Sequence, residues 1–215
     1  MLKHFTTFYV VRHGESEANV KEAQDIQFSV EEEFNTPLSI KGKSEAKKMA
    51  EQFKNIHFDA IFSSDMIRAK ETTNIIRNSR KLSIELISEI RERHFGSYIG
   101  KWNLVRDKIQ ELIKNLHDKD KLIYQYEDVE TEENAVNRLI NFFNKISISH
   151  KGKRVLVVCH GNIMRTFLVK VRYGKYFEIP PGSLINNGYF VVEGDGTNFN
   201  LKEVIGVNKK ILPVV

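Results

Sequence analysis

Two apolar segments that lie far apart in the chain end in the same pair of residues, a histidine followed by a glycine. Residues 9–14 have the sequence YVVRHG, and residues 157–161 have the sequence VVCHG. Both segments are short and rich in β-branched residues, which is typical of buried strands, and a polar residue that can open a helix follows each glycine. Strands that lead directly into helices favour a parallel sheet, whose carboxyl edge would then carry both histidines.

The same alternation of strand and helix patterns runs through most of the chain. Apolar residues at helical spacing separate or follow four short segments that predict buried strands, at residues 6–11, 59–63, 84–88 and 154–159. This order predicts an α/β fold with a mainly parallel central sheet and helices on both faces. Near the end, residues 188–193 and 199–207 flank a glycine-rich turn and predict an antiparallel hairpin.

One region departs from this alternation. Residues 101–116 and 132–148 predict two helices, and the charged stretch between them (118–131) contains no strand pattern. We therefore expect a single domain over residues 1–215 with a small helical cap inserted at about 97–134, beside the sheet. A chain of 215 residues can bury enough surface in one domain without disulfide or metal cross-links.

The composition argues against several classes of protein. A single cysteine, Cys159, leaves no disulfide framework and no cysteine zinc cluster, so we expect neither a metal nor another cofactor. With no recognisable leader and no apolar stretch of membrane-spanning length, we expect a cytoplasmic protein without a membrane partner. The formal net charge of +5 would suit a polyanion, but no nucleic-acid-binding motif accompanies it, so we expect no nucleic acid partner.

Charged residues gather where the predicted strands end. Arg12 directly precedes the first histidine, and Arg68 falls in the first turn of the helix after strand 59–63, with Ser64 or Asp65 as its expected N-cap. A cation is disfavoured at that end of a helix. Arg68 therefore either faces solvent and pairs with Asp65 or Glu71, or is held over an anion. Guanidinium groups grip phosphate oxygens bidentately. Glu92, after another strand, can reach the same edge and donate a proton near an anion.

These residues together resemble the histidine phosphatase superfamily, branch 1, whose members are similar to phosphoglycerate mutase. The resemblance covers residues 6–172 and retains the family's order of motifs. The matching segments are residues 12–19 (RHGESEAN), 36–42 (TPLSIKG), 63–72 (SSDMIRAKET), Arg91-Glu92, Glu130-Thr131 with Arg138, and 158–162 (VCHGN). Cys159 stands where a serine is common, and its place on the strand predicts a small core residue.

The resemblance implies a role for each matching residue. His13 would attack phosphorus and form a phosphohistidine, which divides one difficult displacement into two easier ones. Glu92 would protonate the leaving oxygen and then deprotonate the attacking water. The phosphate would be held by the side chains of Arg12, Asn19, Arg68 and the catalytic His160, and by backbone N–H groups at Gly161 and Asn162. Two arginines and a histidine would take the place of Mg²⁺.

The family contains both phosphatases and mutases. Residues 92–96 (ERHFG) are similar to the mutase motif ERHYG, but Phe95 lacks the tyrosine hydroxyl, and the adjacent arginine pair for a substrate carboxylate is missing. We therefore expect a metal-independent phosphomonoester hydrolase acting on a small phosphorylated metabolite, with Arg93 as a candidate substrate contact. The alternatives are a 2,3-bisphosphoglycerate-dependent phosphoglycerate mutase, a phosphoprotein or phosphohistidine phosphatase, and a non-catalytic phospholigand-binding member.

Two further features stay open at this level. The acidic segment 20–35 either forms one wall of the pocket or is a solvated loop, and the sequence favours neither. The pattern is equally compatible with a monomer and a homodimer.

Overall fold

A six-stranded sheet with the order β3-β2-β4-β1-β5-β6 forms the centre of the molecule. The computed structural model describes residues 5–210 except 25, 28 and 79. The strands are β1 (Thr6–Arg12), β2 (Ala60–Ser64), β3 (Ile84–Ile87), β4 (Arg154–Cys159), β5 (Leu184–Gly194) and β6 (Phe199–Val207). The first four are parallel, and β5 and β6 are antiparallel, which confirms the predicted fold class and terminal hairpin.

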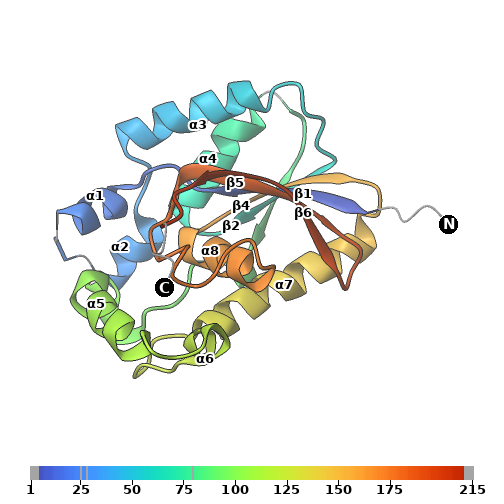
Figure 1. Cartoon of the computed structure of the whole chain (residues 1–215). Helices are drawn as coiled ribbons and strands as arrows, with labels where there is room; N and C mark the ends of the chain where they lie inside the picture. Colours follow the sequence, from blue (N-terminus) through green and yellow to red (C-terminus); the bar gives the residue numbers. More distant parts are fainter. Residues whose placement is uncertain (1–4, 25, 28, 79, 211–215) are drawn as a thin grey trace.

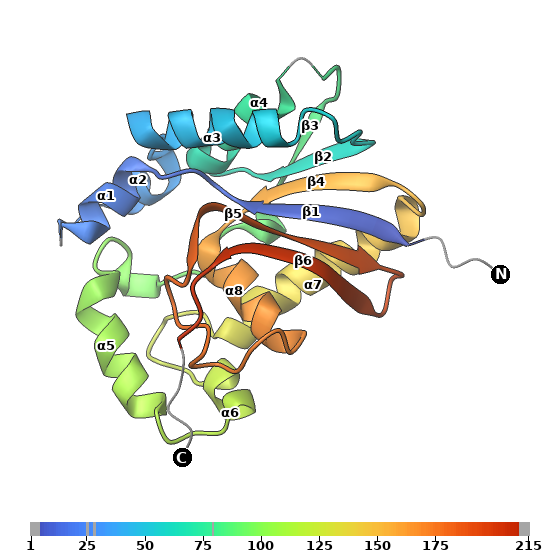
Figure 2. The same cartoon turned by 45° about the horizontal axis from the view of Figure 1, so that its top comes forward.

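Helices cover both faces of the sheet (Figures 1 and 2). One face carries α3 (Ile40–Gln52) and α4 (Ile67–Arg77), and the other carries α7 (Glu132–Ser149) and α8 (Gly161–Lys170). Successive residues of β4 alternate between the two cores: Val155 and Val157 pack with one cluster, and Leu156 and Val158 with the other. An uninterrupted apolar strand therefore results from burial on both faces.

The remaining helices lie near one end of the sheet. These are α1 (Glu17–Ala23), α2 (Val30–Asn35), α5 (Trp102–Ile113), α6 (Asp118–Ile123) and the 3₁₀ turns η1 (Ser88–Ile90) and η2 (Gly96–Tyr98). Figure 2 shows α1 and α2 opposite α5 at this end. Helix α6 lies within the charged stretch 118–131, for which the sequence predicted no strand and named no helix. Its first turn contains Asp118 and Asp120, which the helix dipole favours there.

The predicted cap region shares its core with the sheet. Val105, Ile109 and Ile113 of α5 and Leu122 of α6 are buried in the same cluster as Phe8 of β1. Among the described residues, no helix is both long and apolar enough to cross a membrane.

Strand register brings the ends of the parallel strands together. Arg12 of β1 pairs with Cys159 of β4, and Ser63 of β2 pairs with Val158. Because these strands run in the same direction, the residues that follow them, His13 and His160 among them, lie at one edge of the sheet.

Candidate active site

His13 lies directly after β1, and hydrogen bonds hold its backbone on two sides. Its N–H donates to the carbonyl of Cys159 at 3.0 Å, and its own carbonyl accepts from Asn186 Nδ2 at 3.1 Å. The N–H of Gly14 donates to Thr72 Oγ1 at 3.0 Å. The imidazole is 3% exposed. The backbone of His13 and Gly14 is therefore held by β4, α4 and β5 together.

The partners of the His13 ring assign its tautomer. Nδ1 lies 2.7 Å from the carbonyl oxygen of Gly14, which can only accept, so Nδ1 carries the proton. Nε2 accepts from Nε of Arg68 at 3.2 Å. Burial, followed by the charges of Arg68 and Arg12, holds the pKa of His13 well below that of an ordinary histidine. The neutral ring therefore presents the lone pair of Nε2 toward Arg68.

The two predicted phosphate-binding arginines converge on this histidine from different elements. Arg68, in the first turn of α4, is 4% exposed, and Arg12 is the last residue of β1. Arg12 Nη1 donates to the carbonyl of Leu184, while its buried Nε has no hydrogen-bond partner among the described residues. The guanidinium group of Arg12 packs against Gly161, where a side-chain Cβ would lie only 3.1 Å from Arg12 Nε.

A second glycine explains why the segment TPLSIKG contributes to this site. Ser39 caps α3 by accepting from the N–H of Gly42 at 3.0 Å, and its hydroxyl donates to Glu15 Oε1 at 2.7 Å. A Cβ on Gly42 would lie only 2.0 Å from the carbonyl oxygen of Glu15. The start of α3 therefore rests directly on the loop that carries His13 and Gly14.

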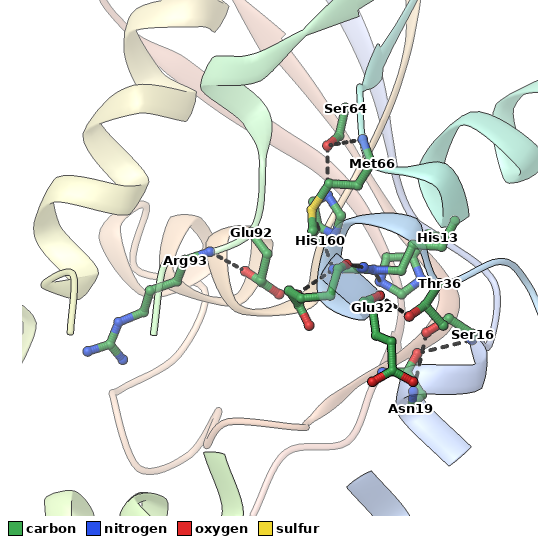
Figure 3. A network of polar contacts seen from close by, with 12 residues as sticks. His13, Ser16, Asn19, Glu32, Thr36, Ser64, Met66, Glu92, Arg93 and His160 are labelled. Atoms are coloured by element: carbon green, nitrogen blue, oxygen red, sulfur yellow. Dashed lines mark hydrogen bonds and ion pairs between the residues drawn. The ribbon is translucent and has the colours of Figure 1, made fainter. Parts of the chain in front are cut away.

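His160 follows β4 and is fully buried. Its Nε2 lies 2.8 Å from Ser64 Oγ, and its Nδ1 has no hydrogen-bond partner among the described residues. The His13 and His160 ring centroids are 5.1 Å apart. Burial and then the charge of Arg68 lower the pKa of His160 well below the usual value. Two neutral imidazoles thus lie side by side at the sheet edge (Figure 3).

The expected N-cap of α4 is wrong. Met66 occupies that position and makes no side-chain cap. Ser64 contacts His160 instead, and Asp65 forms an ion pair with Arg91. Both polar side chains have long-range partners that local sequence does not reveal, and Ser64 Oγ also accepts from the N–H of Met66 at 3.4 Å.

Glu92 lies at the start of α8, and backbone amides hold its carboxylate (Figure 3). Oε2 accepts from the N–H of Asn162 at 3.0 Å, while Oε1 accepts from Ile163 at 3.2 Å and from Arg93 at 2.9 Å. An anion is favoured at a helix N-terminus. The Asn162 N–H, expected to contact phosphate, donates to Glu92 in this structure. The positive end of α8 therefore positions the carboxyl group.

Asn19 lies close to His13, whereas Arg93 lies outside the cavity that contains it. Asn19 forms a capping box with Ser16 at the start of α1 and accepts from Asn186 Nδ2 at 3.2 Å, beside the His13 backbone. Arg93 is directed away from the histidines (Figure 3) and pairs with Glu132 at 3.4 Å. It does not line the cavity that contains His13. Arg93 is therefore held by a buried ion pair with α7, and its role as a substrate contact stays a prediction.

A cavity of about 480 Å³ opens over these groups. Its lining includes Arg12, His13, Asn19, Arg68, Glu92 and Gly161, so most of the predicted site residues meet in one space. Glu22, Glu33 and Arg106 also line it. The sequence offered no signal for Arg106, and the acidic segment 20–35 was its only pointer to the two glutamates. Of the two interpretations of that segment, the structure supports a pocket wall.

Within the described part of the chain, no group of three or more histidine, cysteine or acidic side chains is arranged to hold a metal ion. The charged side chains that line the cavity are arginines and glutamates. Cys159, buried in the core, has its thiol pKa raised by burial. This fits the expected packing role.

Comparison with known proteins identifies the class of this α/β protein. The crystal structure of a phosphoglycerate mutase from Bacillus anthracis superimposes with a TM-score of 0.75 and 23% identity, covering 95% of this chain and 94% of that one. The model of the histidine phosphatase superfamily (branch 1) matches residues 8–204. The chain belongs to this superfamily, and relatives matched across most of its length are named as phosphatases. This confirms the resemblance found in the motifs.

Two relatives illustrate the range of the family. The uncharacterized phosphatase PhoE of Bacillus subtilis is 28% identical, and the match covers 79% of each chain. A metal-independent phosphoserine phosphatase of Arabidopsis thaliana is 26% identical over 87% of this chain and 76% of its own.

Proposed function

We propose that this protein hydrolyses phosphomonoesters of small metabolites without a metal ion, through a phosphohistidine at Nε2 of His13. The observation that carries the proposal is the state of His13. Its proton is on Nδ1, its lone pair is on Nε2, and its lowered pKa keeps the ring neutral. The relative named as a metal-independent phosphoserine phosphatase supports a small phosphorylated substrate.

In the first step, Nε2 of His13 attacks phosphorus, and the bond from phosphorus to the ester oxygen breaks. Glu92, in its protonated form, gives its proton to that leaving oxygen. Arg12, Arg68 and Asn19 hold the non-bridging oxygens. Positioning and cationic stabilisation of this kind supply most of the catalysis in phosphoryl transfer.

In the second step, water attacks the phosphohistidine, and the bond from phosphorus to nitrogen breaks. Glu92 takes the proton from the water, and the lone pair returns to Nε2. His160 contributes its buried Nδ1, which has no partner among the described residues, as a further contact for the phosphate. Phosphate release then restores the neutral ring and the protonated carboxyl group.

The proposal predicts hydrolysis of p-nitrophenyl phosphate in excess EDTA. His13→Ala removes the nucleophile and lowers kcat by roughly four orders of magnitude or more. His57→Ala is the matched control, because that side chain is 80% exposed and does not line the cavity. Quenching in alkaline denaturant during turnover, where a phosphohistidine is stable, traps labelled phosphate on the wild-type and His57→Ala proteins but not on His13→Ala. Full activity in His13→Ala, or complete loss of activity in EDTA, contradicts the proposal.

A mutase is the second candidate, favoured by the similarity of the fold to a phosphoglycerate mutase structure. A mutase returns the phosphate to a substrate whose carboxylate is held in place, and Arg93 is committed to Glu132 here. Incubation with 3-phosphoglycerate separates the two activities. A hydrolase releases phosphate faster than it forms 2-phosphoglycerate, and a mutase does the opposite.

A further inference from the structure

The cavity over His13 is lined by equal numbers of basic and acidic side chains. Its charged lining consists of Arg12, Arg68, Arg106, Glu22, Glu33 and Glu92, three cations and three anions, beside the neutral His13. Two of these carboxylates have no part in the proposed phosphoryl transfer. They are Glu22 of α1 and Glu33 of α2, both from the acidic segment 20–35. A phosphate dianion adds two negative charges to this balanced set.

Glu33 already binds a cation inside the cavity. Its Oε1 lies 2.9 Å from Nη2 of Arg68, and its backbone carbonyl accepts from Nη1 of the same guanidinium. The Arg68 Nε is used by His13, so all three nitrogens of this arginine have partners. A phosphate that binds the same Nη N–H groups of Arg68 as Glu33 therefore displaces Glu33.

Displacement leaves Glu33 in a poor environment for an unpaired charge. Its side chain is only 14% exposed, and a buried carboxylate without a partner is costly. Burial raises the pKa of Glu33, and burial together with Glu33 raises the pKa of Glu22. The two carboxylates together form an anionic wall next to the phosphate position, and a cation on the substrate would restore the lost partner.

We propose that Glu33, supported by Glu22, makes the site selective for phosphomonoesters that carry an ammonium group close to the phosphate. The inference rests on the proposed hydrolase function. With Glu92 protonated for its role as the acid, one ammonium group brings the charges of the lining and the substrate to zero. A substrate with a hydroxyl in the same place leaves an excess negative charge beside Glu33.

The test compares two esters that differ only in this group, phosphoethanolamine and 2-hydroxyethyl phosphate. We expect kcat/KM in the wild-type protein to favour the ammonium ester by about tenfold or more, as for a hydrogen bond between charged groups. Glu33→Gln keeps the shape and removes the charge, so the ratio falls towards one. Glu31→Gln, on the exposed face of the same helix, retains the wild-type ratio.

Hydrolysis of p-nitrophenyl phosphate reports on the hydrolase separately, because that ester has no ammonium group. If His13-dependent hydrolysis is present but the wild-type ratio is near one, the selectivity is overturned and the hydrolase stands. An unchanged ratio in a folded Glu33→Gln protein also overturns it. The wild-type ratio decides the matter alone if that variant fails to fold. Absence of hydrolysis of all three esters overturns both proposals.

Discussion

At the scale of single residues, hydrogen-bond partners set the tautomer of His13 and the position of the Glu92 carboxyl group. The Gly14 carbonyl places the proton of His13 on Nδ1, and the Arg68 Nε contacts the opposite nitrogen. The backbone amides of Asn162 and Ile163, at the start of helix α8, hold the carboxylate of Glu92. Backbone geometry therefore sets the tautomer of His13 and the position of the Glu92 carboxyl group.

The buried neutral histidines predict an acid-sensitive fold. His13 and His160 have lowered pKa values in the folded state, so below about pH 6.5 the unfolded chain binds more protons than the native one. The free energy of unfolding therefore falls as pH decreases, by up to about 1.4 kcal/mol per pH unit for each histidine. Urea unfolding between pH 7.5 and 5.5 measures this slope.

A variant separates these histidines from the other titrating groups. His13→Gln removes one of the two contributions and makes the slope shallower, whereas His57→Gln, at an exposed position, leaves it unchanged. Equal slopes in the wild-type and His13→Gln proteins would contradict the neutral assignment of His13.

At the scale of elements, helix α7 holds the loop that carries Glu92. Arg138 binds both carboxylate oxygens of Glu130 at 2.9 Å and donates to the carbonyls of Arg91 at 3.3 Å and Glu92 at 3.4 Å. Glu130 in turn accepts from the N–H of His94 at 2.9 Å. The pair therefore joins α7 to both ends of the loop, and Arg138 is a positioning residue for Glu92.

We expect Arg138→Met to lower kcat by an amount that depends on the leaving group of the substrate. An alkyl phosphate needs a proton from Glu92, so kcat falls by about 10- to 100-fold when that carboxyl group is misplaced. The p-nitrophenolate ion leaves without protonation, and its release is affected much less. Arg138→Lys, which keeps the charge, recovers part of the loss. Equal losses with both substrates would indicate a general structural defect.

At the scale of the whole molecule, the apolar core is continuous from the sheet into the region 97–134. Ile109 of α5 is 4% exposed and belongs to the same buried cluster as Leu139 of α7. We propose that this region unfolds with the sheet as part of a single domain.

Removing side-chain volume from α5 tests this cooperativity. Ile109→Ala creates a cavity and lowers the free energy of unfolding of the whole chain by about 2–4 kcal/mol, in one transition. Ile40→Ala, at a position that is 92% exposed, changes it by less than about 0.5 kcal/mol. A separate early transition in Ile109→Ala, with an unchanged main one, would show that the cap is an independent unit.

The sequence by itself determined the strands of the sheet and the edge at which the motifs meet. The spacing of apolar residues and the positions of glycines are local properties of the chain. They predicted the parallel strands and the terminal hairpin, and they placed His13, His160, Arg68 and Glu92 at one edge of the sheet. The boundaries differ from the expected ones by a few residues, and the helix at Asp118–Ile123 was missed because its charged sequence has little apolar periodicity.

Only the tertiary structure decided which charged groups pair. Arg93 turns to Glu132, Asp65 to Arg91, and Glu33 to Arg68, and the partners in each pair are 26 to 39 residues apart. An ion pair forms where folding brings two charges within a few ångströms, and residue spacing along the chain does not specify that distance. The same motifs therefore predict a phosphate site, while the wall beside it depends on where α2 packs.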